Sequence, residues 1–273
     1  MQTDNIICWR QNKETAEVTH FHIWSEGYSI CGDRESQQDY GGIVEKDNQF
    51  LSVVCDGMGG MQGGELASSQ TVQNMIYDYQ KTDIELGKET EFLEREVIHV
   101  NQLIASLKGE NNCLLKSGTT MVSTLIAGNK LYWISVGDSR IYLLRDEKLI
   151  QITRDHNYQE LLKDELTEGK ITKQVYELKS KGKQAKALTS YIGIANLKKI
   201  GKNNKPMMLK DGDQILLCSD GIYKSLTNRQ IKAMLIDNQI DMYVSVKRLV
   251  NMAWSQSVKS QDNATAILIQ YRE

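Results

Sequence analysis

The sequence is poor in the features that divide a chain into domains or direct it to a membrane. Its 273 residues contain a single proline, Pro206, and no Gly/Ser/Pro-rich linker, so the composition indicates no domain boundary. No apolar run approaches the roughly 20 residues of a membrane-spanning helix. The first residues, MQTDN, lack the basic start and apolar stretch of a signal peptide. We therefore expect one domain over residues 1–273, in the cytoplasm and without membrane attachment.

Charge of one sign and paired cysteines are also lacking. The 33 Lys and Arg residues nearly balance the 35 Asp and Glu residues, which gives a net charge of -2 and no basic surface of the kind that binds nucleic acid. The five cysteines are widely spaced and include no C-x-x-C pair, so we interpret them as reduced thiols. We expect a monomer that does not bind nucleic acid.

What the sequence does contain is a series of short strand-like runs and a few long helical patterns. The predicted strands cover residues 50–55, 121–127, 131–136, 141–144, 214–218 and 265–270. The predicted helices cover residues 65–79, 93–107 and 246–254. Turns of hairpin size, such as Gly128 and Asn129, join several strands, which favours antiparallel sheets covered by helices. The polar residues 157–190 predict a helical excursion or flap on the surface.

Four aspartates stand at the ends of predicted strands. They are Asp56 after strand 50–55, Asp138 after 131–136, Asp220 after 214–218 and Asp262 before 265–270. If they meet at one rim of a sheet, their repulsion raises their pKa values unless cations neutralise them. Oxygen donors without a His or Cys cluster favour Mg²⁺ or Mn²⁺ over zinc. Since Asp-Gly after a strand is also an ordinary turn signal, the spacing alone leaves a purely structural role open.

Seven segments, in order along the chain, resemble the motifs of the metal-dependent serine/threonine phosphatases of type 2C, the PPM family, in its bacterial form. They are GDRESQQD (32–39), VVCDGMGG (53–60), SGTT (117–120), VGDSR (136–140), ITRDHN (152–157), LCSDG (217–221) and DNAT (262–265). The resemblance extends over residues 27–270, and seven ordered motifs are far more specific than any one of them.

The resemblance implies an α+β fold, a four-layer α-β-β-α sandwich of two antiparallel sheets flanked by helices. It also implies two Mn²⁺ or Mg²⁺ ions at one end of the sandwich, where a bridging hydroxide hydrolyses phosphomonoesters. Carried over, Asp56 would bridge both ions and the Gly57 carbonyl would bind one of them. Asp220 and Asp262 would hold the other, and Asp39 would bind directly or through water.

The same resemblance assigns the catalytic residues and the partners. Arg34 would bind the substrate phosphate, because its planar fork can donate two hydrogen bonds, and it would act with Asp56 and Asp220 in catalysis. The implied substrates are phosphoserine and phosphothreonine proteins, with a cytoplasmic serine/threonine kinase and its substrates as partners.

This chain also departs from the family pattern. Met58 stands where the eukaryotic branch has a histidine proposed as general acid, so water or another group must protonate the leaving group. Asp138 resembles the ligand of a third, weaker metal, but Lys224 replaces an aspartate found in some members and disfavours that ion. Ser190 replaces a frequent arginine near the flap. His156 matches the pattern, and we interpret it as a hydrogen-bonded structural histidine.

Two other functions compete with phosphoprotein hydrolysis. One is a weakly catalytic or non-catalytic regulatory module that binds phosphoproteins through the same cleft. The other is a two-metal hydrolase of nucleotides or phosphodiesters. The balanced charge argues only against nucleic acid as its substrate.

Overall fold

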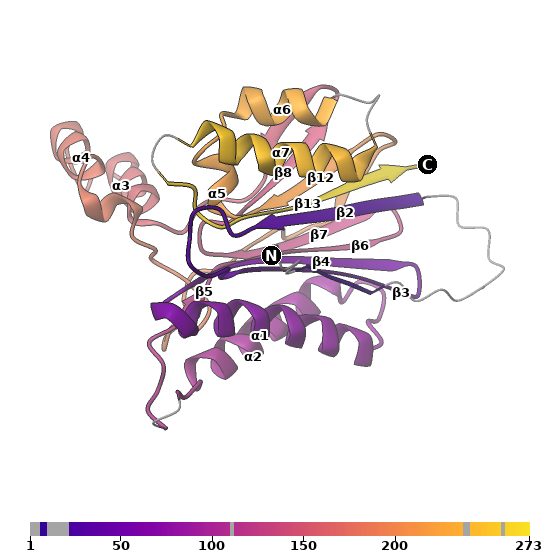
Figure 1. The fold of residues 1–273 in the computed structure, drawn as a ribbon, viewed down its shortest axis with the longest axis horizontal. Coiled ribbons are helices and arrows are strands. Elements are labelled where there is room, and N and C mark those ends of the chain that lie inside the picture. Colours follow the sequence, from indigo (N-terminus) through magenta and orange to yellow (C-terminus); the bar gives the residue numbers. More distant parts are fainter. Residues whose placement is uncertain (1–5, 10–21, 110–111, 237–240, 258–259) are drawn as a thin grey trace.

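The computed structural model describes residues 6–9, 22–109, 112–236, 241–257 and 260–273, which form two packed β-sheets between pairs of helices (Figure 1). The first sheet has the spatial order β1 (Ile6–Trp9), β3 (Asp39–Lys46), β4 (Gln49–Met58), β6 (Met121–Ala127), β7 (Lys130–Val136) and β10 (Gly201–Lys202), with β5 (Gly118–Thr119) paired to β4 and β11 (Met207–Met208) paired to β7. The second has the order β2 (His22–Ile30), β13 (Ala264–Arg272), β12 (Gln214–Cys218), β8 (Arg140–Arg145) and β9 (Lys148–Gln151).

Helices cover the outer face of each sheet. The helices are α1 (Gly60–Lys81) and α2 (Glu89–Ala105) on the first sheet, and α6 (Asn228–Ile236) and α7 (Met242–Gln256) on the second (Figure 1). These four layers confirm the predicted α+β sandwich. Among the strand pairs that the structure describes, β1 differs from the antiparallel prediction because it runs parallel to β3.

The two-sided burial of the central strands follows from side-chain alternation. In β4, Leu51, Val53 and Cys55 face the core under α1 and α2, whereas Phe50 and Val54 face the core between the sheets. Successive side chains of a strand point to opposite faces, so a strand covered on both sides reads as one continuous apolar run. The sequence therefore indicates these strands clearly, and all six predicted strands are present.

The sequence indicates β3 less clearly because glycines interrupt its apolar pattern. A Cβ at Gly42 would lie 2.4 Å from Ile76 Cδ1 and 2.6 Å from Val72 Cγ1, both on α1. The missing side chain lets α1 approach the sheet closely, and the same absence hides the strand from a hydrophobicity pattern. The predicted helix 65–79 likewise begins earlier, at Gly60, within the glycine-rich segment.

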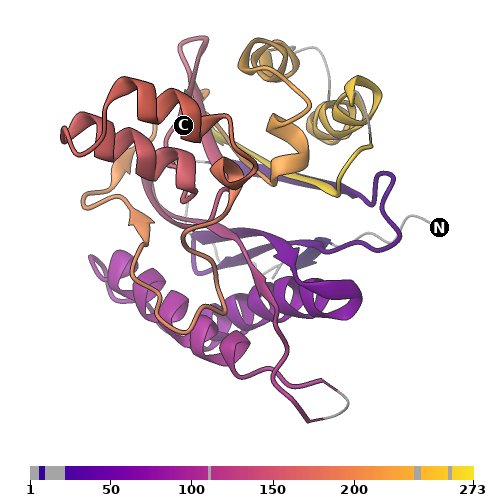
Figure 2. The ribbon, with the colours of Figure 1, turned by 90° about the vertical axis from the view of Figure 1, so that its left-hand side faces the viewer.

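The polar segment after β9 forms a separate helical projection. It contains α3 (Tyr158–Thr167), α4 (Lys173–Ser180) and the 3₁₀ turn η1 (Lys183–Lys186). Both α-helices begin with a side-chain cap, because Asn157 Oδ1 accepts from the Glu160 amide and Thr172 Oγ1 from the Val175 amide. Figure 1 shows α3 and α4 extending away from the sandwich, and Figure 2 shows them from the front. α4 has no buried residue.

Cys31, Cys55 and Cys218 are free cysteines, and the side chain of Cys8 lies outside the described part.

His156 joins the base of this projection to the sandwich. Its Nδ1 accepts a hydrogen bond from the Gly137 amide at 3.2 Å, and its own amide donates to the Gly137 carbonyl at 2.8 Å. The residue is 2% exposed. Burial, followed by the positive charge of Lys199, lowers the pKa of His156 to about 4. The contacts agree with the structural role predicted for this histidine.

The low pKa of His156 predicts a loss of stability in mild acid. The unfolded chain takes up a proton near pH 6.5 and the folded chain does not, so stability is retained above pH 6.5 and falls towards pH 4. Between pH 7 and pH 5 the loss is about 2 kcal/mol. His156→Asn keeps an acceptor without the titration. Urea unfolding of the parent and the variant at both pH values should show that the difference in their unfolding free energies changes by this amount. The same dependence on pH in both proteins would contradict the prediction.

Candidate active site

Two aspartates of the first sheet lie directly across from one another. Asp39 begins β3 and Asp56 lies near the end of β4, and the antiparallel register pairs them. Residues in such opposite positions have Cβ atoms about 4.5–5.5 Å apart. Asp39 also connects the two sheets, because its Oδ2 accepts a hydrogen bond of 2.6 Å from Ser219 Oγ, after β12. The register thus brings both carboxylates to one end of the sandwich.

The second sheet supplies two more aspartates at the same end. Asp220 follows β12 and begins the short helix α5 (Asp220–Tyr223), and Asp262 precedes β13, the neighbour of β12. A Cβ at Gly221 would lie 2.1 Å from the Asn263 carbonyl oxygen, so only glycine lets these turns approach so closely. Strand ends distant in sequence are thereby packed against one another.

The SGTT motif holds the backbone of Asp56. Thr120 Oγ1 accepts from the Asp56 amide at 3.0 Å, and the Thr120 amide and Thr119 Oγ1 donate to the Asp56 carbonyl at 2.8 and 2.9 Å. Thr120 Oγ1 also contacts Ser139 Oγ at 2.6 Å, next to Asp138. These bonds fix the backbone of one carboxylate and connect it to the loop that carries another.

Gly57 is closely surrounded. A Cβ there would lie 2.1 Å from the Gly64 carbonyl oxygen and 2.6 Å from that of Gln38, and the Gly57 amide donates to Gln38 at 3.0 Å. No side chain fits between β4 and the start of α1. The strand therefore turns tightly behind Asp56.

A cleft of about 650 Å³ opens beside these residues. Its described lining is Asp33, Arg34, Glu35, Ser36, Gln38, Asp56, Gly57, Met58, Gly59, Asp262 and Asn263. Four predicted site residues, Arg34, Asp56, Gly57 and Asp262, are among them. The predicted ligands Asp39, Asp138 and Asp220 are buried next to the cleft and do not form its lining, so the set divides into a cleft wall and a buried part behind it.

Burial and mutual repulsion affect the buried carboxyl groups strongly. Burial, with Asp220 and Asp262 contributing repulsion, raises the pKa of Asp39 to about 7. Burial and Asp220 raise the pKa of Asp138 to about 6, and burial with the neighbouring aspartates raises that of Asp56 well above its usual value. Such a set of hard oxygen donors fits Mg²⁺ or Mn²⁺, because bound cations compensate the repulsion.

Among the described residues, no three of these aspartates place carboxylate oxygens all within 4.8 Å of one another.

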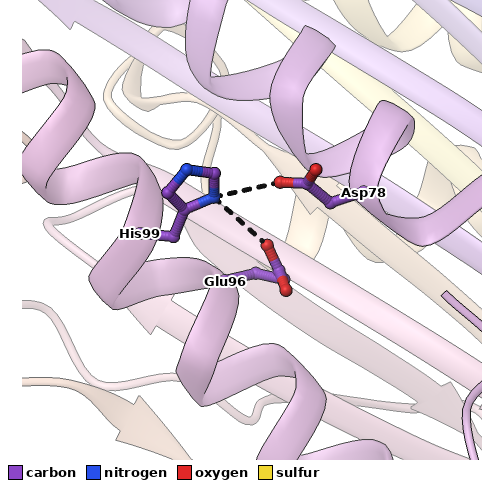
Figure 3. A group of neighbouring side chains, drawn as sticks. All are labelled: Asp78, Glu96 and His99. Atoms are coloured by element: carbon purple, nitrogen blue, oxygen red, sulfur yellow. Dashed lines mark hydrogen bonds and ion pairs between the residues drawn. The ribbon is translucent and has the colours of Figure 1, made fainter. Parts of the chain in front are cut away.

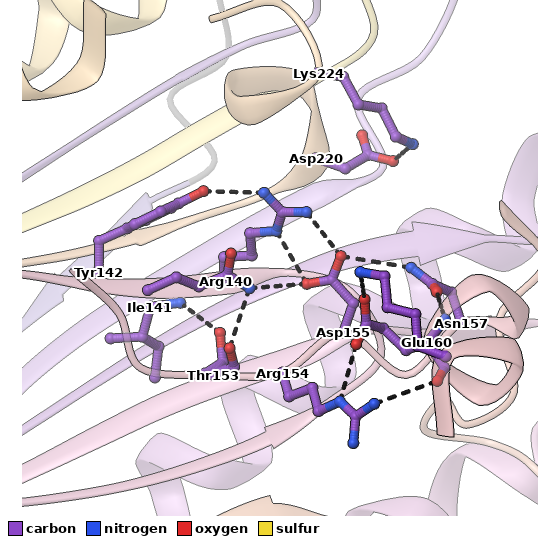
Figure 4. Close-up of polar contacts among 12 residues, drawn as sticks. Arg140, Ile141, Tyr142, Thr153, Arg154, Asp155, Asn157, Glu160, Asp220 and Lys224 are labelled. Carbon is purple, nitrogen blue, oxygen red and sulfur yellow. Dashed lines mark hydrogen bonds and ion pairs between the residues drawn. The ribbon is translucent and has the colours of Figure 1, made fainter. Parts of the chain in front are cut away.

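Two basic side chains contact this acidic set. Arg34 Nη2 donates to Asp262 Oδ2 at 2.7 Å. Lys224, the C-terminal cap of α5, pairs through Nζ with Oδ2 of Asp220, the first residue of that helix (Figure 4). Lys224 also lowers the pKa of Asp138, against the larger effect of burial. Arg34 and Lys224 thus supply part of the positive charge that compensates the aspartates.

Arg140, the arginine of the VGDSR motif, has a structural role. Arg140 Nε and Nη2 donate to the two oxygens of Asp155 at 2.9 and 2.8 Å, and Nη1 donates to the Tyr142 hydroxyl at 3.1 Å (Figure 4). Its guanidinium lies 3.5 Å from the ring centroid of Tyr223. This bidentate pair joins β8 to the loop before α3, and it supports the wall behind Asp138 rather than the cleft.

Sequence reasoning missed a group of residues that hold the cleft wall together. Asp33 Oδ2 accepts from the Gln261 amide at 2.8 Å, and the Asp33 amide donates to the Gln261 carbonyl at 3.0 Å. The buried Gln261 side chain then donates to the Gly221 carbonyl and accepts from Ser225, both at 3.0 Å. Gln261 therefore connects the turn of Asp220 to the loop of Arg34. The only indication of this role in the sequence is that Gln261 directly precedes the DNAT motif.

Asn263 ties down the same loop. Its Nδ2 donates to the Cys31 and Ser36 carbonyls at 2.8 and 3.0 Å, and its Oδ1 accepts from the Gln38 amide at 2.8 Å. The loop before β3 is thus held at its beginning, middle and end by the residue that follows Asp262. The asparagine of this motif positions the loop of Arg34.

The comparisons with known proteins agree with this geometry. The sequence model of the family described as Protein phosphatase 2C matches residues 26–261. The chain therefore belongs to the protein phosphatase 2C family, which confirms the resemblance found in its motifs.

Three relatives show how far the similarity extends. The chain is 30% identical over 240 residues to the serine/threonine phosphatase stp of Listeria welshimeri, which covers 87% of this chain and 91% of the relative. The structure of the S. agalactiae serine/threonine phosphatase is similar with a TM-score of 0.80 and 25% identity, over 92% of this chain and 100% of that one. The structure of the catalytic domain of the phosphatase PstP, in complex with two manganese ions, is similar with a TM-score of 0.71 and 27% identity, over 93% of this chain and 100% of that one.

The position of Gln261 predicts a large effect of a nearly isosteric change. Gln261→Met would leave the Gly221 carbonyl without this donor and cost about 1–3 kcal/mol of unfolding free energy. Gln256→Met, at an exposed position on α7, should stay within about 0.5 kcal/mol of the parent. Denaturant unfolding of both variants measures this, and equal stabilities would show that the Gln261 contacts contribute little.

The repulsion among the aspartates predicts opposite effects of Asp56→Asn with and without metal. In chelator the variant should melt at a higher temperature than the parent, since one buried charge is removed. In Mn²⁺ the parent should gain thermal stability with ion concentration and the variant should not. Thermal melts in both buffers decide this, and an equal gain in Mn²⁺ would exclude Asp56 as a ligand.

Proposed function

We propose that this chain hydrolyses phosphoserine and phosphothreonine monoesters on proteins at a binuclear Mn²⁺ or Mg²⁺ centre. The observation that carries the proposal is the convergence of buried aspartates from strand ends of both sheets beside Arg34 and the cleft. The PstP catalytic domain, which is in complex with two manganese ions, supports the metal content. The serine/threonine phosphatases among the relatives support the substrate class.

The proposed ligands take the roles that the motifs imply. Asp56 would bridge the ions with the Gly57 carbonyl beside it, Asp220 and Asp262 would hold the second position, and Asp39 would bind directly or through water. Two bound cations supply an activated water and stabilise the charge that develops during phosphate-ester hydrolysis. Ser219 donates to the Asp39 carboxylate, and the two threonines of the SGTT motif hold the backbone of Asp56.

Arg34 would bind the substrate phosphate at the edge of the centre. Its side chain is 57% exposed at the cleft while one Nη2 hydrogen bond ties it to Asp262. A guanidinium has five N–H donors, so others stay available for phosphate oxygens. The tie to Asp262 fixes the phosphate subsite relative to a metal ligand, which is the alignment that in-line displacement needs.

The departures from the family motifs shape the rest of the proposal. Met58, at the cleft, cannot donate a proton, so water or another group would protonate the leaving serine or threonine. Lys224 pairs with Asp220 and reduces the negative potential at Asp138. We infer that a third ion at Asp138 would bind weakly.

We infer further properties from the same features. None of the described helices is both long and apolar enough to cross a bilayer. We propose a monomeric, cytoplasmic, single-domain enzyme over residues 1–273, opposing a serine/threonine kinase and sharing its substrates. The projection formed by α3 and α4, within residues 157–190, would act as its surface flap.

The test is phosphate release from a phosphothreonine peptide by metal-stripped protein, before and after Mn²⁺ is added. We expect turnover only with Mn²⁺, and Asp220→Asn should reduce it on the order of 100-fold or more. Asp83→Asn, an exposed aspartate paired with Lys46, should leave it unchanged.

Three outcomes would contradict the proposal. Full activity in chelator would exclude metal dependence. Mn²⁺ binding without turnover would favour the regulatory module. Preference for a phosphodiester or nucleotide over the peptide would favour the alternative hydrolase.

A further inference from the structure

Three side chains with metal-binding groups meet between α1 and α2, on the helical layer of the first sheet. Asp78 comes from α1, and Glu96 and His99 come from α2 (Figure 3). One ligand atom from each lies within 4.8 Å of the other two. Neither the family motifs nor the proposed phosphatase centre uses these residues.

The separations suit a small tetrahedral ion. His99 Nδ1 lies 3.1 Å from Asp78 Oδ2 and 3.6 Å from Glu96 Oε2. Zinc bonds to nitrogen and oxygen are about 2.0–2.2 Å long, so adjacent ligands of a tetrahedral ion stand about 3.4 Å apart. Figure 3 shows both carboxylates directed towards the same ring nitrogen. Glu-x-x-His spacing on one helix puts both α2 ligands on one face.

The charges at this point also favour a cation. The Glu96 side chain is only 4% exposed, and burial together with the neighbouring Asp78 carboxylate raises the pKa of Glu96. Arg95 holds Glu96 Oε1 at 2.8 Å, which orients the carboxylate and leaves Oε2 facing His99. Two carboxylates this close together repel one another, and a divalent ion between them would reverse that effect.

Access to the cluster is open from solvent. The His99 side chain is 50% exposed and that of Asp78 is 22% exposed, so an ion can enter between the helices and keep a water as fourth ligand. One imidazole with two carboxylates favours a zinc-type transition ion over Mg²⁺, which prefers oxygen ligands only.

We propose that Asp78, Glu96 and His99 form a second metal site, which holds one zinc-type divalent ion between α1 and α2. The ion would join two helices that otherwise pack through apolar contacts over the first sheet. Asp78 lies in the last turn of α1, at the end of the helix away from Asp56, so the site would stabilise the helical layer over the first sheet without contributing to the chemistry.

The test compares Zn²⁺ binding by the metal-stripped full chain and by His99→Gln, using equilibrium dialysis with metal analysis. Both proteins keep the aspartate cleft, so Zn²⁺ bound there cancels in the comparison. We expect the parent to bind one equivalent more than His99→Gln and to gain more thermal stability in Zn²⁺. Glu91→Gln removes an exposed carboxylate paired with Lys88 on the same helix and should keep the extra equivalent.

Two further measurements keep the result interpretable. Asp78→Asn repeats the loss with a nearly isosteric change if His99→Gln unfolds, and thermal melts in chelator verify that each variant folds. Mn²⁺-dependent phosphate release should be the same in the parent and His99→Gln, so a failure of this site is distinguishable from a failure of the phosphatase proposal. Equal Zn²⁺ stoichiometry in parent and folded variants would overturn the inference.

Discussion

Repulsion between buried carboxylates is the constraint around which one end of this sandwich is organised. Asp39 and Asp56 face each other across a strand pair, and the second sheet brings Asp220 and Asp262 to the same end. Buried charges of one sign are unfavourable unless cations and hydrogen bonds compensate them. The serine on Asp39 and the basic partners Arg34 and Lys224 provide such compensation, while the threonines behind Asp56 hold its backbone in place.

The hydrophobic pattern was sufficient to locate six of the described strands, β4, β6, β7, β8, β12 and β13, for a specific physical reason. Strands covered on both faces, such as β4 and β12, are continuous apolar runs, and an aspartate directly after such a run is conspicuous. β3 was harder to detect because Gly41 and Gly42 interrupt its apolar run, and Gly42 lies where α1 packs on the sheet. The hydrophobic pattern was therefore least informative at Gly42, where side chains of α1 occupy the space that a β3 side chain would fill.

The site could be predicted in its residue types but not in its connections. The positions of Asp56, Asp220 and Asp262 follow from local sequence, whereas the bond between Ser219 and Asp39 joins residues 180 positions apart. Sequence spacing contains no information about that pairing without the strand register. The same limit explains why Glu96 and His99 share a visible i,i+3 spacing while their partner Asp78, on another helix, could not be named in advance. Motif membership also did not separate Arg34, at the cleft, from Arg140, which is bound to Asp155.

The position of β13 has a consequence for how the protein is made. This strand is the last described element in the sequence, yet it lies between β2 and β12 in the second sheet, and Asp262 immediately precedes it. During synthesis, chains emerge N-terminus first at about 5–20 residues per second. Until residues 262–272 have left the ribosome, β2 and β12 have no strand between them and the carboxylate set is incomplete. A nascent chain would therefore have no complete centre, and the ion position that needs Asp262 could form only after translation of this segment.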